Sequence, residues 1–427
     1  VKDFEKLCKL LDEHDPARTF KLEGDVKERF ELLSKRVKRQ LILEAVGKNA
    51  LNRAGKWVQL FNEALRECLS ALGLRGALLS KELKSFVEDP VTHLEKKLFI
   101  YFFDLLRRRI SLEGFREKGH AAVTTSLMTN LRSIYQNWAL LSLWTLLAKE
   151  YGAEVSYPEH GYLHLERLGR QRLGEINPNL ILRLAGRGSL SFFLEVPRPV
   201  SWEDTSDLVK AWDLYTALRP DIMVCGGFIT NLIDLSQTPP IHQPDMIIEC
   251  KELVDWYERV RDVKGPFAKP LTVEEWRSKW ITGLYEGLAD VLGVSPSKAA
   301  KKVAEQRGLR LREDRVVVLY HSIYRPKAMY LISRAKTPGD VKKALEKEGI
   351  IVVDSVKFNA GALKCVVDDL ARIAKPSTSL EEHLSQLVRS LEERGLKIMP
   401  QKLVELALRY VGENAEDFAS WLSRSVS

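Results

Sequence analysis

Over roughly the first third of the chain, apolar positions recur at the spacing of amphipathic helices. The segments FNEALRECLSALGL (61–74) and LEKKLFIYFFDLLRRRI (94–110) show this period, and glycine and proline are sparse there. A longer stretch, SLMTNLRSIYQNWALLSLWTLLAKEYG (126–152), has a broad apolar face and stops at Gly152, a residue that commonly follows a last helical turn. The pattern predicts an all-helical N-terminal domain over residues 1–122.

After Gly152 the apolar positions alternate, or run together, over strand lengths bounded by Gly, Pro and Asn. We expect strands at 161–168, 179–186, 189–196, 219–227, 244–252, 314–322, 327–334 and 349–356. We expect helices at 204–218, from 252 to about 308, at 337–348 and at 359–375. This mixture predicts an α/β domain over residues 123–375, followed after PSTS by a small helical C-terminal module, 376–427.

Composition narrows the class of protein without naming a function. The 427 residues are 45% apolar and 29% charged, which is typical of a folded soluble protein, and no apolar run is long enough for a membrane span. Five scattered cysteines without a CxxC pair predict reduced thiols and a cytoplasmic location. The net charge of +8 fits a polyanionic partner such as nucleic acid, and it fits lysine-rich solvated helices equally well.

The most informative stretch is QPDMIIECKE (243–252), where an apolar run leads into Glu249 and Lys251. Charges at the end of a buried strand are costly to desolvate unless something uses them. Two residues apart on a strand, they point to one face and lie about 6.6 Å apart along it. The alternative is a surface ion pair, which is what we expect for the same Glu-x-Lys pattern in helical text at 82–84 and 95–97.

Two aspartates that follow prolines could supply a second carboxylate. Asp245 lies on the same strand as Glu249 but roughly 13 Å away, too far to share an ion. If the strands around 221–225 and 246–250 pair as an antiparallel hairpin, Asp221 lies beside Glu249 instead. We therefore predict that these two acids bind Mg²⁺ or Mn²⁺ and that Lys251 orients a water or stabilises the transition state.

RPDIMV (219–224) and IIECKE (247–252) resemble the Pro-Asp and (D/E)XK elements of the PD-(D/E)XK, or restriction-endonuclease-like, nuclease superfamily. The expected order of elements over 126–375 is similar to the core of that family, with a last strand at 314–320. The resemblance implies a mixed sheet flanked by helices and metal-dependent hydrolysis of nucleic acid. DNA is the expected substrate, in defence, restriction or repair, with a separate motor or specificity subunit as a further partner.

IYQNWALLSLWTLL (134–147) is similar to the Tyr-Glu-x-Trp helix of McrC-like restriction subunits, in which a glutamate helps to bind the metal. The matching position here is Gln136, and a neutral amide is a poorer ligand for Mg²⁺. Either Glu195 in FFLEVPRP supplies the third acid, or the site has only two carboxylates. The alternative for Trp138 and Trp144 is a buried helix face.

Two other functions stay open. The chain could be a nuclease-fold subunit with a degraded site that binds nucleic acid or a partner protein without cleaving, or it could be unrelated to nucleic acid. If nucleic acid binds, the basic run SKRVKRQ offers its phosphates Lys35, Arg36, Lys38 and Arg39. The segment EEWRSKWITGLYEG (274–287) could also touch a nucleic-acid backbone, or be a solvated amphipathic helix.

Overall fold

In the computed structural model the chain forms two compact units. The first unit is Val1–Arg66 with Leu79–Ala139, and the second is Glu67–Leu78 with Leu140–Ser427. The described residues are 2–165, 171–172, 176–196, 200–201, 219–234, 237, 241–263, 285–287, 289–299, 301 and 309–376. Two expected features fall largely or wholly outside them, the helix at 204–218 and the C-terminal module.

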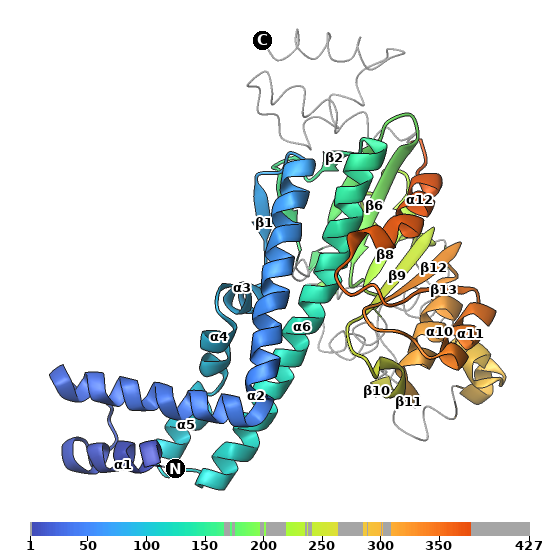
Figure 1. The fold of residues 1–427 in the computed structure, drawn as a ribbon. Helices are drawn as coiled ribbons and strands as arrows, with labels where there is room; N and C mark the ends of the chain where they lie inside the picture. The colour runs from blue at the N-terminus through green and yellow to red at the C-terminus, as the bar shows by residue number, and fades with distance from the viewer. Residues whose placement is uncertain are drawn as a thin grey trace, which may run out of the picture. The chain divides into compact units, whose positions relative to one another are not determined.

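Helices build the first unit, as the apolar spacing predicts (Figure 1). They are α1 (Lys2–His14), α2 (Gly24–Ala71), α3 (Lys81–Glu88), α4 (Pro90–Lys97), α5 (Phe99–Leu106) and α6 (Leu112–Tyr151), of which α2 and α6 continue into the second unit. The expected boundary at 122/123 therefore lies inside α6. Gly47 bends α2 because its backbone is non-helical, with φ 74° and ψ 158°.

A seven-stranded mixed sheet is the centre of the second unit, with strand order β13-β12-β9-β8-β6-β5-β2. Its strands are β2 (Glu154–Tyr157), β5 (Leu180–Leu184), β6 (Gly188–Leu194), β8 (Ile222–Gly226), β9 (Met246–Lys251), β12 (Ala328–Ser333) and β13 (Ile350–Val353). The pairs from β2 to β9 are antiparallel, whereas β12 runs parallel to both β9 and β13.

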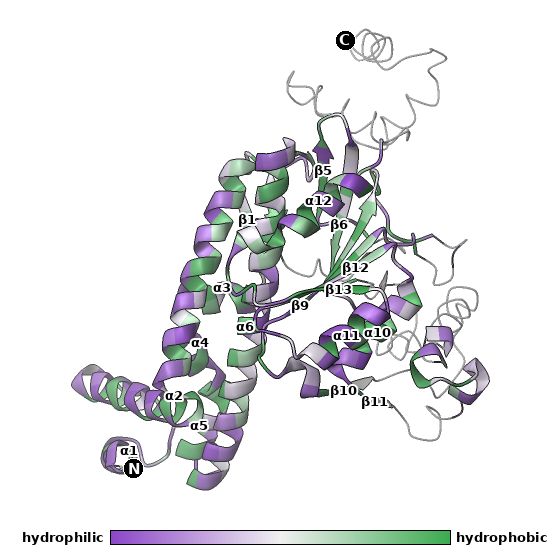
Figure 2. Ribbon diagram, turned by 45° about the vertical axis from the view of Figure 1, so that its right-hand side comes forward, coloured by the Kyte–Doolittle hydropathy of each residue, from purple (hydrophilic) through white to green (hydrophobic). Residues whose placement is uncertain are grey.

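Helices cover both faces of this sheet. They are α10 (Glu313–Tyr324), α11 (Gly339–Lys347) and α12 (Lys364–Ile373), together with the last turns of α6. Neighbouring residues of β6 separate the faces, since Phe192 packs edge-on against Trp144 of α6 while Phe193 belongs to the apolar cluster that contains α10 and α11. The strands are accordingly apolar in Figure 2, as expected for a sheet that is buried on both sides.

Several short elements lie outside the main sheet. Three two-stranded sheets are formed by β1 (Gly76–Leu78) with β3 (Tyr162–His164), β4 (Gln171–Arg172) with β7 (Val200–Ser201), and β10 (Val260–Val263) with β11 (Leu309–Arg312). Two 3₁₀ turns are η1 (Trp256–Glu258) and η2 (Ala360–Leu363). Within the described residues, no helix has the length and apolar character needed to cross a membrane.

The expected strand at 314–322 is wrong, because these residues form helix α10. The run of β-branched residues favours a strand, but Val316, Tyr320 and Ile323 also share one face of a helix, and that face is buried in the core. The next strand in the chain is β12, which lies within the expected range 327–334.

The expected helix from 252 to about 308 is also wrong at its start, because η1 and β10 follow Glu252. In contrast, the strands expected around β5, β6, β8, β9 and β13, and the helices expected around α11 and α12, are confirmed.

Candidate active site at the paired ends of strands β8 and β9

The expected antiparallel hairpin is present and brings two acids together. Ile222 of β8 pairs with Ile248 of β9, so Asp221 lies next to Glu249. The backbone N–H of Asp221 donates to Glu249 Oε2 at 3.1 Å, and the backbone N–H of Cys250 donates to Asp221 Oδ2 at 2.8 Å. These backbone bonds fix both carboxylates at the strand ends and compensate part of the cost of burying them.

Lys251 completes the arrangement on the same face of β9. Its ammonium donates to Glu249 Oε1 at 2.8 Å and to Glu313 Oε2 at 2.9 Å. The Glu249 side chain is 0% exposed, that of Lys251 5% and that of Glu313 15%. The structure thus joins the three predicted catalytic residues in one buried cluster.

Glu313 is a member of the cluster that sequence reasoning missed. It is the first residue of α10, which begins directly after β11. The strand that the sequence predicts over 314–322 gave no reason to expect Glu313 near β9. The available signal was the acidic pair Glu313-Asp314 in front of an apolar run, which is typical of a first helical turn.

An aromatic ring lies beside the ammonium. The centroid of the Trp256 ring is 5.9 Å from Lys251 Nζ, within the range of a cation–π contact, and Trp256 is buried. On the other side of the strand end, the carbonyl of Lys251 accepts the backbone N–H of Arg334 at 2.9 Å. Both contacts restrict how far Lys251 can move.

The backbone of Glu195, the proposed third acid, lies next to Asp221 of the cluster. Its N–H donates to the carbonyl of Asp221 at 2.9 Å. Its φ of 47° is left-handed, which is uncommon for a non-glycine residue and concentrates at functional sites and turns. The role of its carboxylate as a metal ligand stays a prediction.

Gln136 lies in the part of α6 that belongs to the first unit, and its side chain is buried. Trp138, two residues on, stacks on Tyr135 with 5.7 Å between ring centroids, and Trp144 is fully buried. The interpretation of these tryptophans as a buried helix face is therefore confirmed.

Asp245 lies at the opposite end of β9, as expected. Its carboxylate accepts from Lys327 at 2.8 Å, from Lys375 at 2.7 Å and from the backbone N–H of Gly226 at 2.8 Å. Burial raises the pKa of Asp245, but the hydrogen bonds from Lys327, Lys375 and the Gly226 N–H, together with the positive charge of Lys375, outweigh burial and hold this pKa below its ordinary value. These contacts give Asp245 a role in joining strands and helices, away from Glu249.

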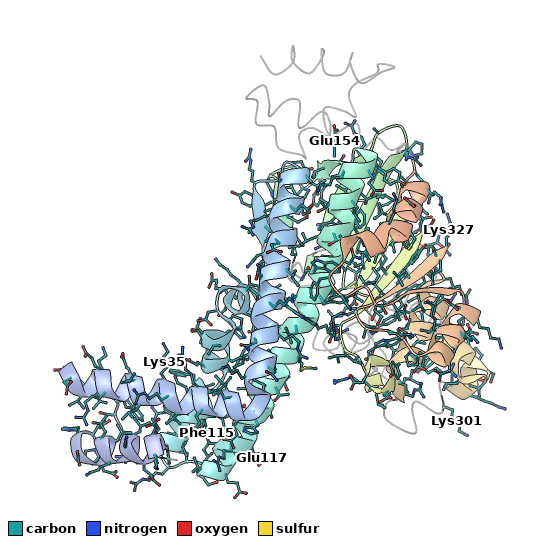
Figure 3. The ribbon with its side chains drawn as sticks, viewed as in Figure 1. Lys35, Phe115, Glu117, Glu154, Lys301 and Lys327 are labelled. Atoms are coloured by element: carbon teal, nitrogen blue, oxygen red, sulfur yellow. The ribbon has the colours of Figure 1, made fainter. Side chains whose placement is uncertain are left out.

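The four predicted basic residues of α2 differ in their availability. Lys35, labelled in Figure 3, and Arg36 are exposed. Arg39 instead pairs with Glu95 at 2.6 Å. Lys38 is half-buried with its ammonium 5.5 Å from the Phe102 ring centroid, and burial lowers its pKa.

The donor atoms of the cluster suit a hard divalent cation. Asp221 and Glu249 supply carboxylate oxygens, the ligands that Mg²⁺ prefers, and Mg²⁺ commonly takes one or two carboxylates and keeps several waters. When all four groups are ionised, the carboxylates of Asp221, Glu249 and Glu313 and the ammonium of Lys251 have a net charge of −2. One divalent cation balances this charge. In the described part of the chain, no set of three or more His, Cys, Asp and Glu residues is arranged to hold a metal. Asp221 and Glu249 are the two carboxylates of the cluster that could hold such a cation together with water.

Comparison with known proteins adds no assignment, since neither a protein-family model, a curated protein nor a solved structure matches this chain. The functional argument accordingly rests on the geometry of this cluster.

Proposed function

We propose that this chain is a metal-dependent nuclease that hydrolyses phosphodiester bonds, with DNA as its substrate, on a restriction-endonuclease-like fold. The observation that carries the proposal is the buried contact of Asp221, Glu249 and Lys251 at the paired ends of β8 and β9. Apolar side chains would close a strand end at lower cost, so charges kept here favour a chemical use.

The order of the elements supports the same proposal. Helix α6 precedes the antiparallel strands β5, β6, β8 and β9, and α10 then leads to β12, which is parallel to β9. This is the order that the resemblance to the PD-(D/E)XK nucleases implies, with β12 in place of the strand expected at 314–320.

Each residue of the cluster has a distinct role in the proposed reaction. Asp221 and Glu249 would hold Mg²⁺, which when bound would lower the pKa of a water and screen the phosphate charge. The water oxygen adds to phosphorus, one P–O ester bond breaks, and the leaving oxygen ends protonated. Lys251 donates hydrogen bonds toward the attacking water or the phosphoryl oxygens, where negative charge develops.

Two observations favour a second candidate, a nuclease-fold subunit that binds without cleaving. Gln136 stands where the similar helix has a glutamate, and Glu249 has no solvent exposure. Both would fit a site that has lost its reaction.

A cleavage assay with three variants separates these functions. Plasmid and single-stranded DNA are incubated with Mg²⁺ or Mn²⁺, and Mn²⁺ binding is titrated by calorimetry. Glu249→Gln removes an anionic ligand and should abolish metal binding and cleavage. Lys251→Ala should keep the metal but lose about 10²–10³-fold in rate.

Asp245→Asn is the matched control, because it changes a buried acid at the other end of the same strand. Although this change should cost stability, the variant should bind Mn²⁺ and cut like the parent under conditions in which circular dichroism shows both proteins to be folded. Retention on DNA without cleavage under any condition would favour the binding subunit. If the parent is neither retained on DNA nor able to cleave it, the nuclease and the DNA-binding subunit are both refuted.

A further inference from the structure

The ammonium of Lys251 is shared by carboxylates from two elements. Glu249 belongs to the same strand, whereas Glu313 reaches Lys251 from the first turn of α10, 62 residues along the chain. The two bonds have nearly equal lengths, 2.8 and 2.9 Å. The proposed reaction gives Glu249 a role as ligand and Lys251 a role as donor, but it leaves Glu313 without one.

A divalent cation on Glu249 would compete with the ammonium for the same carboxylate. Oxygen Oε2 of Glu249 already accepts the Asp221 N–H, and Oε1 accepts Lys251. Like charges on one carboxylate repel each other, so metal binding would weaken the bond from Lys251 to Glu249. A lysine with no other anionic partner would then turn away from the reacting phosphate.

Helix α10 holds Glu313 firmly as such a partner. The backbone N–H of Glu313 donates to the carbonyl of Arg259 at 2.8 Å, and Val316 and Tyr320 of the same helix are fully buried. The neighbouring Arg312 is engaged with Asp314 at 2.8 Å. An acid in the first turn of a helix also interacts favourably with the helix dipole.

We propose that Glu313 is a positioning residue, which holds the Lys251 ammonium in place while Glu249 is occupied by the divalent cation. This inference rests on the proposed nuclease function. It assigns a role to a residue outside the Pro-Asp and (D/E)XK elements.

A double-mutant cycle tests the inference with the full chain. The variants are Glu313→Gln, Lys251→Ala and the two combined, with Asp314→Asn as the matched control in the same helical turn. Single-turnover cleavage is measured at saturating Mn²⁺, and the urea midpoint of unfolding is measured without metal.

We expect Glu313→Gln to lower the cleavage rate by on the order of tenfold, the size of one lost charge-assisted hydrogen bond, with little change in the DNA concentration that gives half-maximal rate. The combined variant should be no slower than Lys251→Ala, because Glu313 acts through that lysine. The shifts in urea midpoint should likewise fail to add. Asp314→Asn should cut like the parent.

The results that would refute the nuclease function differ from those that would refute only the role of Glu313. An inactive parent refutes the nuclease function and this role with it. An active parent, with Glu313→Gln cutting at the parental rate or with effects that multiply in the combined variant, overturns the role of Glu313 and leaves the nuclease function standing. Additive shifts in urea midpoint overturn the contact itself.

Discussion

Replacing Asp245 with asparagine removes one charge from a buried acid of the second unit that two lysines and a backbone N–H contact. The Asp245 side chain is 4% exposed and accepts hydrogen bonds from Lys327 (labelled in Figure 3), Lys375 and the Gly226 N–H. The lysines lie just before β12 and just after α12, so one carboxylate joins both to β8 and β9. Asparagine has nearly the same shape and keeps a carbonyl oxygen for Gly226, but it loses the attraction to both lysines.

The size of the effect follows from burial. Removing one partner of a fully buried ion pair costs about 3–5 kcal/mol, whereas an exposed pair contributes about 0.2–1 kcal/mol. Here the acid is buried while Lys327 and Lys375 are 62% and 47% exposed, so water screens the lysine side of each pair. We therefore expect Asp245→Asn to lower the free energy of unfolding by about 1–3 kcal/mol at pH 7.

The effect should depend on pH in a defined direction. The lysines hold the folded-state pKa of Asp245 below its ordinary value of 3.8 despite burial. A carboxyl group of this kind stabilises the fold above the unfolded-state pKa, and its contribution disappears as the pH falls through the folded-state pKa. The difference between parent and variant should be fully present from pH 5 to 7 and should shrink steadily below about pH 4.

Urea unfolding followed by circular dichroism at pH 7, 5, 4 and 3 measures this difference. Glu346→Gln, a change at an exposed acid of α11, serves as the control and should behave like the parent. Equal stability of parent and Asp245→Asn at pH 7, or a difference that stays constant down to pH 3, would refute the reasoning.

Three further changes have expected outcomes. Gly47→Ala should cost about 1–3 kcal/mol of unfolding free energy in a urea titration, because φ 74° and ψ 158° form a backbone region almost restricted to glycine. Gly226→Ala should cost at least about 1–3 kcal/mol by the same measurement, because a Cβ there would lie 2.1 Å from the carbonyl oxygen of Ile373 and force backbone to move. If the chain binds nucleic acid, Lys35→Glu with Arg36→Glu should weaken DNA binding and lower the slope of log affinity against log salt by about 0.9 per lost phosphate contact; an unchanged slope would count against this surface.

The β8–β9 hairpin could be predicted because two local signals agree. Each strand is a short apolar run that follows a Pro-Asp pair. The start of the strand and its burial can therefore be predicted from neighbouring residues alone. Once the two strands pair as neighbours, strand geometry alone places Asp221 near Glu249 and Asp245 far from it. Long-range information is needed only for the pairing itself.

Helix α10 could not be predicted from the same kind of signal. Val316, Val317 and Val318 favour a strand by intrinsic propensity, and because all three are buried, no polar positions recur among them at the 3.6-residue period that would reveal a helix. The packing of α10 against the sheet decides its structure. Glu313 was missed as a consequence, because its contact with Lys251 exists only when the helix starts at that residue.

Stability alone gives a poor reason for the cluster at the end of β9. A buried ion pair usually contributes no more than well-packed apolar side chains of the same volume, because desolvation offsets the attraction between the charges. Apart from Glu249, Cys250 and Lys251, all residues of β9 are apolar, and the whole strand is buried. Glu249 and Lys251 are therefore exceptions within a strand that could be closed more simply. Their presence beside Asp221 and Glu313 supports the proposed function, because a phosphodiester with its divalent cation would use both the carboxylate oxygens and the fixed ammonium.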